Sequence, residues 1–193
     1  MKHWIPVAMI AVLPIVIDAQ SAAPPPLPDM SWKARFTSQY QYVRGHLVKM
    51  AEKMPPEWYA FQPTPEVKTF AANLGHIIRG NAGQCSALLG RRSPLADQDF
   101  EKTVTAKADL VKAVHEVFAF CDEYFTNLSD DQLKNGTYQS SVVRDGQKIP
   151  LNVPHISNVA AFLSHNNEMY GYMSVYMRLK GVIPPSSDRG DSK

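Results

Sequence analysis

The segment PHISNVAAFLSHNNEMYGYMSVYMRLKGVIPPSS, at residues 154–187, contains the longest amphipathic pattern of the chain. Pro154 suits the first turn of a helix, and Gly181 stops it before Pro184-Pro185, so we expect one helix over residues 154–180. Between these limits apolar side chains return every three or four residues, which is the spacing of one helix face. The stripe consists of Val159, Phe162, Met169, Met173, Tyr176 and Met177. A helix of this kind needs partners to cover its apolar side.

Three segments upstream show the same spacing, at residues 32–54, 69–89 and 105–128. Their apolar stripes are formed by Phe36, Tyr40, Val43, Leu47, Met50 and Met54 in the first, by Phe70, Leu74, Ile77, Ile78, Cys85 and Leu88 in the second, and by Val111, Val114, Val117, Phe118, Cys121 and Phe125 in the third. Four amphipathic helices predict an all-α four-helix bundle with one shared core. The links after the first and third helices are long, so the up-and-down order of the helices stays open.

A short stretch before the last helix has a different pattern. Two β-prone runs, Tyr138–Arg144 and Gln147–Val153, flank the dipeptide Asp145-Gly146. An Asp-Gly pair between such runs is a strong signal for a tight turn between two antiparallel strands. We therefore expect a small β-hairpin on the bundle, immediately before the last helix.

The N-terminus has the layout of a secretory signal peptide. A basic start precedes an apolar run over residues 4–17, and small residues follow at suitable cleavage positions. We predict a signal peptide over residues 1–19, with cleavage after Ala19 or as late as Ala23. The alternative is an uncleaved N-terminal anchor, although the apolar run is short for a membrane span. Export would place the mature chain in the periplasm or outside the cell, with no stable membrane insertion after cleavage.

The remainder divides into three parts. A proline-rich linker is expected at residues 20–30, the helical bundle at 31–187 and a disordered tail at 188–193. The two cysteines, Cys85 and Cys121, lie on different predicted helices. In an oxidising compartment they could form a disulfide, and the alternative is two buried free thiols.

Composition and charge exclude several classes of function. The 193 residues are 45% hydrophobic and 20% charged, which is typical of a globular domain. A net charge of +2, without a run of basic residues, argues against a nucleic-acid partner or an anionic membrane surface. The chain has no glycine-rich phosphate loop, no GxSxG motif and no CxxC motif.

The histidines outside the leader are the main candidates for chemistry. His165 lies at the edge of the apolar stripe of the last helix, where it can face a cavity or be a hydrogen-bonded core residue. His76 lies on a flank of the second helix that also carries small residues, which would let a helix or a ligand approach closely. For His46, His115 and His155 we expect surface or helix-capping roles.

Two motifs resemble those of the DinB/YfiT-like family. The first is PTPEVKTF at residues 63–70, followed by Leu74-Gly75-His76. The second is HNNE at residues 165–168, continued by Tyr170-Gly171 and by YMRLKGVIPPSS at 176–187. The similarity runs from about Trp32 to Ser187. It implies an unusual four-helix bundle that often pairs as a homodimer.

The resemblance also implies a metal centre. In this family three histidines hold a divalent ion, commonly zinc or nickel, and in characterised members the ion activates a low-molecular-weight thiol. His76 matches the ligand on the second helix and His165 the first ligand on the last helix. The third ligand position holds Met169, a thioether with little preference for zinc or nickel. Glu168 is adjacent but points about 100° away around the helix.

Three interpretations follow from this departure. The chain could be an exported divalent-metal-dependent hydrolase or transferase whose altered site is completed by water, Glu168 or His46. It could instead be a degenerate, non-catalytic protein that binds a small molecule in the inherited cavity. A third interpretation is a copper site, because Met169, Met173 and Met177 continue the row of His165 at intervals of four. Export disfavours thiol transfer and favours metal-activated water. The substrate is not identified by any of these patterns.

Overall fold

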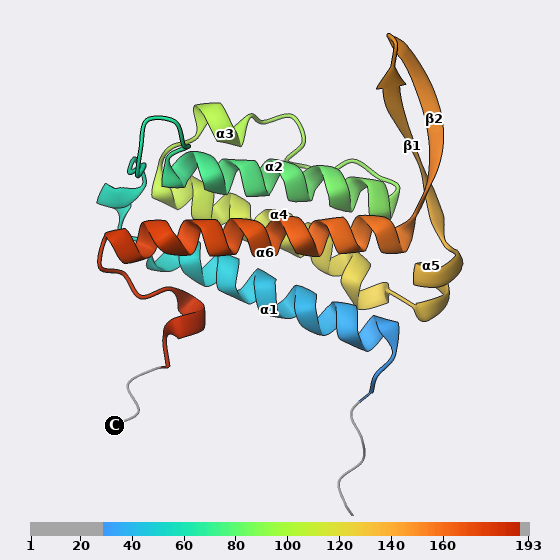
Figure 1. The fold of residues 1–193 in the computed structure, drawn as a ribbon, viewed down its shortest axis with the longest axis horizontal. Helices are drawn as coiled ribbons and strands as arrows, with labels where there is room; N and C mark the ends of the chain where they lie inside the picture. Colours follow the sequence, from blue (N-terminus) through green and yellow to red (C-terminus); the bar gives the residue numbers. More distant parts are fainter. Residues whose placement is uncertain (1–28, 190–193) are drawn as a thin grey trace, which may run out of the picture.

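The computed structural model describes residues 29–189. The predicted signal peptide, its cleavage site and most of the linker lie outside this range, as do residues 190–193 of the predicted tail. Four long helices dominate the described part of the chain (Figure 1). They are α1 (Trp32–Lys53), α2 (Phe70–Leu89), α4 (Lys107–Asn127) and α6 (His155–Leu179). The all-α bundle predicted from the sequence is confirmed.

Helix ends follow local side-chain chemistry. The hydroxyl groups of Ser31 and Thr69 accept hydrogen bonds from backbone N–H groups in the first turns of α1 and α2, which satisfies donors that a helix leaves free. Gly90 ends α2 in the left-handed conformation, with a φ of 66°. Pro154 precedes α6 as its N-cap and is not inside its first turn, so this helix begins one residue later than expected.

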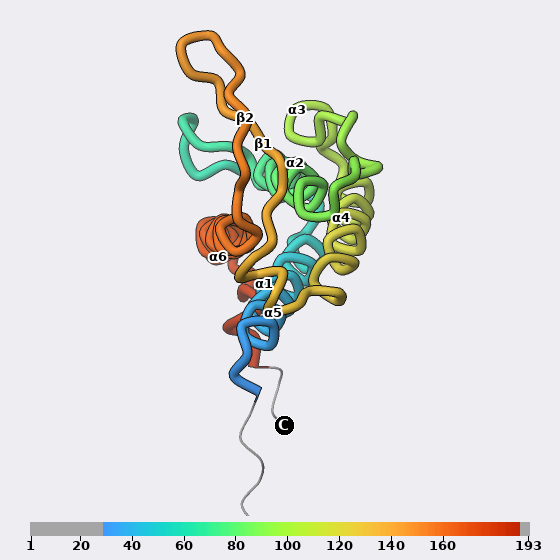
Figure 2. Tube along the Cα trace, turned by 90° about the vertical axis from the view of Figure 1, so that its right-hand side faces the viewer, coloured from blue at the N-terminus to red at the C-terminus, as the bar shows by residue number. Residues whose placement is uncertain are grey.

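The four helices do not alternate up and down. α4 and α6 lie on opposite sides of the bundle, and each packs against both α1 and α2 (Figures 1 and 2). α2 and α4 run in the same direction, and α1 and α6 run in the opposite one (Figure 1). Long links make this order feasible, because a parallel neighbour requires the chain to return along the full length of the bundle.

Short elements occupy these links. α3 (Phe100–Thr103) lies between α2 and α4, and α5 (Asp130–Asn135) follows α4. Single 3-10 turns are found at Pro56–Trp58 (η1) and Pro185–Ser187 (η2). The helix α5 was not predicted from the sequence, because Ser129, whose side chain caps it, is equally typical of a loop.

The predicted β-hairpin is present and stands away from the bundle (Figure 1). It consists of β1 (Thr137–Arg144) and β2 (Gln147–Pro154), paired antiparallel with Arg144 opposite Gln147. Asp145 and Gly146 have φ values of 51° and 77°, the positive values that a two-residue hairpin turn requires.

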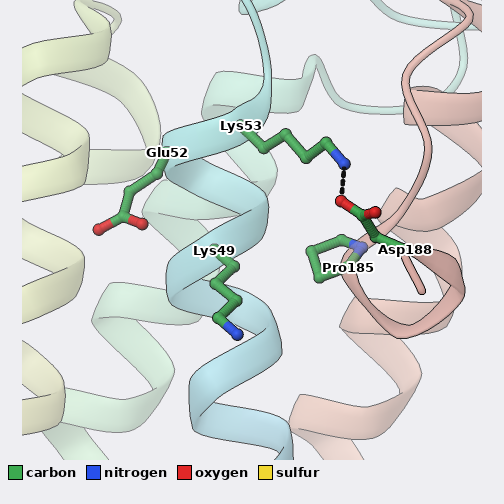
Figure 3. Close-up of a pocket in the computed structure, with 5 residues that line it drawn as sticks. All are labelled: Lys49, Glu52, Lys53, Pro185 and Asp188. Carbon is green, nitrogen blue, oxygen red and sulfur yellow. Dashed lines mark hydrogen bonds and ion pairs between the residues drawn. The ribbon is translucent and has the colours of Figure 1, made fainter. Parts of the chain in front are cut away.

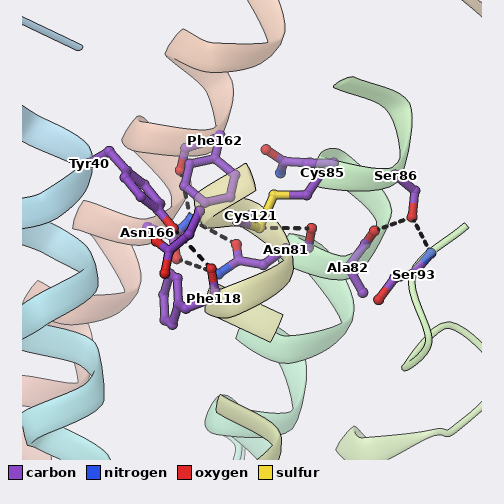
Figure 4. Close-up of a disulfide and its surroundings, with 12 residues drawn as sticks. Tyr40, Asn81, Ala82, Cys85, Ser86, Ser93, Phe118, Cys121, Phe162 and Asn166 are labelled. Atoms are coloured by element: carbon purple, nitrogen blue, oxygen red, sulfur yellow. Dashed lines mark hydrogen bonds between the residues drawn. A yellow bond between two sulfur atoms is a disulfide. The ribbon is translucent and has the colours of Figure 1, made fainter. Parts of the chain in front are cut away.

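The core contains one disulfide, which joins Cys85 on α2 to Cys121 on α4 across a Cα–Cα distance of 5.4 Å (Figure 4). Both cysteines are completely buried. The structure therefore favours the first of the two states that the sequence left open. Within residues 29–189 no helix is both long and apolar enough to cross a bilayer.

Candidate metal centre

The two predicted ligands come together between α2 and α6. The Nε2 atom of His76 lies 3.3 Å from the Nε2 atom of His165, although the residues are 89 positions apart. Two nitrogen ligands on one tetrahedral zinc ion, each about 2.0–2.1 Å from the metal, would be separated by roughly 3.3 Å. The imidazole pair therefore has the spacing of two ligands that share an ion.

Gly80 makes this approach feasible. It lies one turn after His76 on the same face of α2, and the His165 ring rests directly on it. A Cβ atom at position 80 would be 3.3 Å from Cε1 of His165, which is closer than most carbon contacts. The absence of a side chain thus lets an imidazole from α6 lie flat against α2.

A reciprocal amide pair fixes the register of the same two helices (Figure 4). The side-chain amide of Asn81 donates to Oδ1 of Asn166 at 3.0 Å, and that of Asn166 donates back to Oδ1 of Asn81 at 2.8 Å. Both residues are completely buried. Because Asn166 follows His165 directly, this pair also determines where His165 meets α2.

A carboxylate that the sequence analysis missed orients His76. Nδ1 of His76 lies 3.2 Å from Oε2 of Glu101 on α3. The short helix reaches this position by packing on Gly75, where a Cβ atom would lie only 2.3 Å from the carbonyl oxygen of Phe100. A histidine that donates its Nδ1 proton to a carboxylate presents the Nε2 lone pair on its other side, as metal-binding histidines commonly do.

Glu101 is ionised and well supported. Its carboxylate pairs with Lys68 at 2.6 Å and with Arg79 at 2.9 Å, while its side chain is only 15% exposed. The hydrogen bond from Lys68, followed by that from His76, lowers the pKa of Glu101 to about 2. The Glu101 carboxylate therefore accepts hydrogen bonds from Lys68 and Arg79, and it also positions His76.

His165 is less well satisfied. Its Nδ1 atom is buried and has no hydrogen-bond partner within residues 29–189. Burial lowers the pKa of His165, and the nearby His76 lowers it further. Both effects favour neutral imidazole, which is the form that binds metal ions.

None of the other candidates, Met169, Glu168 and His46, provides the third histidine ligand that the resemblance implies. Met169 is buried one turn after His165 on α6, at the position the resemblance implies. Glu168 is exposed on the outer side of that helix, and His46 contacts Tyr42 and Tyr170 at the interface of α1 and α6. Among residues 29–189 no cluster of three or more His, Cys, Asp or Glu side chains is placed to hold an ion.

Comparison with known proteins agrees with this architecture. A profile of the DinB superfamily matches residues 39–161, which is more than half of the chain. The chain belongs to the DinB superfamily. The matched residues include His76 and the hairpin and end four positions before His165.

A crystal structure of a DinB-like protein from Bacillus cereus ATCC 10987 resembles this DinB chain with a TM-score of 0.59. The alignment covers 80% of this chain and 96% of the other, at 18% sequence identity. Such low identity shows the shared fold and leaves the activity open. No curated protein matches the sequence.

One of the other histidines in this DinB bundle differs from expectation. His155 was expected at the surface or as a cap, but it is only 7% exposed. Its Nδ1 atom lies 2.9 Å from the hydroxyl group of Tyr124, and the ring of Tyr138 on the hairpin covers it edge-on. This cover could not be predicted from the helical pattern, because it comes from Tyr138 at the base of the hairpin, where β1 pairs with the end of β2. His115 is exposed and pairs with Glu52, as expected of a surface residue.

Two surface depressions of the DinB bundle bear on a ligand site. One, of about 320 Å³, lies beside the imidazole pair and is lined by Arg79, Ala96, Asp97, Gln98, Asp99, Glu101 and Lys102. The other, of about 420 Å³, lies between the end of α1 and η2 and contains the ion pair of Lys53 and Asp188 (Figure 3). Only the first shares residues with the candidate metal centre.

Proposed function

We propose that this chain is an exported DinB protein that binds one divalent metal ion weakly at His76 and His165 and uses it for hydrolysis or group transfer. The observation that carries the proposal is the 3.3 Å separation of the two Nε2 atoms. Two imidazoles at this distance, one of them oriented by Glu101, fit an ion such as zinc. Met169 does not fit as a zinc or nickel ligand, so two protein ligands and solvent would have to suffice.

The residues around His76 and His165 would position the two imidazoles for metal binding. Glu101 holds the proton of His76 on Nδ1 and keeps Nε2 directed at His165. Gly80 and the Asn81–Asn166 pair hold the ring of His165 in place. A divalent ion at this position supplies Lewis acidity, which lowers the pKa of a coordinated water molecule toward 7.

Export is supported by the leader-like N-terminal sequence and by the disulfide. Disulfides such as Cys85–Cys121 persist in oxidising compartments and are rare in the reducing cytoplasm. Low-molecular-weight thiols are kept reduced mainly in the cytoplasm, so this location favours water over a thiol as the nucleophile.

The test is metal binding by the purified mature protein beside a Met169→His variant. We expect the parent to bind zinc weakly and Met169→His to bind it at least about 100-fold more tightly, because the variant regains a third imidazole one turn from His165. The double variant His76→Ala/Met169→His is the matched control and should lose most of that gain. Equal binding by the parent and by Met169→His would contradict the proposal.

A second candidate function is small-molecule binding without catalysis. It is favoured by the missing third ligand together with the 320 Å³ depression beside Arg79. The measurement is a thermal shift with a set of small carboxylates and phosphates, in the presence of a metal chelator. Ligand-dependent stabilisation that survives chelation and disappears in Arg79→Ala would favour this function over the metal-dependent one.

A further inference from the structure

Two buried polar atoms between α2 and α6 have no hydrogen-bond partner within residues 29–189. They are Nδ1 of His165 and Oε1 of Gln84. Buried side-chain polar atoms in proteins usually have a partner. Gln84 belongs to the same interface as His165, because the side-chain amide of Asn158 on α6 donates to the carbonyl oxygen of Gln84 at 3.4 Å. The two unpaired atoms therefore lie along one helix interface.

The side chain of Gln84 is placed to reach the ring of His165. Gln84 lies one turn after Gly80, where a Cβ atom would be 3.8 Å from Nδ1 of His165. Side chains on a helix lean toward its N-terminus, so that of Gln84 leans back over Gly80. Cβ positions four residues apart are about 5–6 Å from each other, a distance that the long glutamine side chain can span. No side chain of Gly80 separates the amide from the ring.

The tautomer of His165 explains why neither atom is paired. Nδ1 of His76 donates to Glu101, which leaves a lone pair on Nε2 of His76. The 3.3 Å contact between the two Nε2 atoms is then a hydrogen bond only if Nε2 of His165 carries the proton. In that tautomer Nδ1 of His165 is an acceptor, as is Oε1 of Gln84. Two acceptors cannot bond to each other, so both stay unpaired.

We propose that Gln84 is the positioning residue of His165, and that its Oε1 accepts a proton from Nδ1 once Nε2 of His165 binds a divalent ion. This inference rests on the metal centre proposed above. Nε2 loses its proton to solvent and Nδ1 gains one from solvent, so the ring is neutral before and after. Gln84 then serves His165 as Glu101 serves His76. Metal-binding histidines almost always donate their second N–H group to such an acceptor.

The first measurement is NMR spectroscopy of the imidazole nitrogens in the purified mature protein at about pH 8, where imidazole is neutral. We expect the proton of His165 on Nε2 before zinc chloride is added and on Nδ1 at saturating zinc, with the signal assigned by its loss in His165→Leu. In zinc-loaded Gln84→Met the Nδ1 proton should exchange faster with solvent, because a thioether is only a weak acceptor. A His165 ring that carries its proton on Nδ1 before zinc is added would overturn the proposal.

The second measurement is the zinc affinity of variants at position 84. We expect Gln84→Met to bind zinc about tenfold more weakly than the parent and Gln84→Glu to restore the affinity, because a carboxylate again accepts the proton. Gln41→Met, at an exposed glutamine of α1, is the matched control and should bind as the parent does.

The outcomes separate this inference from the metal centre on which it rests. Equal zinc affinities of the parent and Gln84→Met, or equal losses in Gln84→Met and Gln84→Glu, would overturn the role of Gln84 alone. If neither the parent nor Met169→His bound zinc, the metal centre itself would be overturned, and this inference with it.

Discussion

Two polar pairs lie between α2 and α6, and they differ in how completely they are satisfied. In the Asn81–Asn166 pair the amides exchange hydrogen bonds, and Asn166 also donates to the carbonyl oxygen of Phe162. In the His76–His165 pair the two Nε2 atoms lie 3.3 Å apart, yet Nδ1 of His165 is buried and has no partner within residues 29–189. Buried polar groups in proteins are normally paired.

The contrast separates a pair whose polar atoms all have partners from a pair in which one buried nitrogen has none within residues 29–189. The asparagines hold the register of the helices, and each of their side-chain polar atoms already has a partner. Glu101, which contacts His76, also lines a surface depression open to solvent.

The largest expected effect comes from breaking the covalent link next to the asparagine pair. The disulfide closes a loop between cysteines 36 positions apart in the sequence. The variant Cys85→Ala/Cys121→Ala removes this constraint, so the unfolded chain gains entropy. We expect the free energy of unfolding to fall by about 3–4 kcal/mol, measured by urea denaturation. Reductant should destabilise the parent to a similar extent and leave the variant unchanged. A parent indifferent to reductant would contradict the disulfide.

A smaller effect should distinguish the two polar pairs directly. Asn81→Leu leaves the amide of Asn166 buried without its partner, at a cost of about 2–3 kcal/mol in unfolding free energy. His165→Leu, one residue from Asn166, should change stability by less than about 0.5 kcal/mol, because the imidazole it removes is itself incompletely bonded. Chemical denaturation of both variants measures the difference. Equal losses would mean that the histidine pair is as structural as the asparagine pair.

The smallest effect concerns the pH dependence of stability and the buried ring of His155. Burial lowers the pKa of His155 below its ordinary value of 6.5. The unfolded chain therefore takes up a proton below about pH 6.5 that the folded chain resists, and stability falls as the pH is lowered through this range.

We expect His155→Gln to flatten this decline by under about 1 kcal/mol between pH 7 and pH 5, measured as the unfolding free energy at each pH. His165→Leu is the companion variant, because the pKa of His165 is lowered as well. If neither variant changes the slope, burial does not control the titration of these rings.

Local sequence signals were sufficient for most of the fold. The apolar stripes of the helices and the Asp145-Gly146 turn are patterns within a few residues, so they can be recognised without knowing the packing. The four long helices and the hairpin were predicted within a few residues. The parallel direction of α2 and α4 could not be predicted, since it depends on how the link between them crosses the bundle.

The candidate site was predicted only in part. His76 and His165 were identified through the family resemblance, and the structure brings them together. Glu101 was missed because α3 is a single turn with no apolar periodicity of its own. The signal that could have found it is Gly75, a glycine inside a helix at which another backbone must approach. The burial of His155 depends on Tyr124 of α4 and on Tyr138 at the base of the hairpin, which the helical pattern of α6 does not reveal.

The disulfide has a consequence for how the bundle opens. It ties α2 to α4 covalently, whereas α6 is held by packing and by side-chain hydrogen bonds such as those of Asn166 with Asn81 and of His155 with Tyr124. Partial unfolding should therefore release the last helix first, while the covalently joined half persists, and backbone amides of α6 would exchange with deuterium ahead of those in α2. An ion that bound both imidazoles would add a reversible link between α2 and α6. The supply of metal would then affect how long α6 stays packed on the bundle.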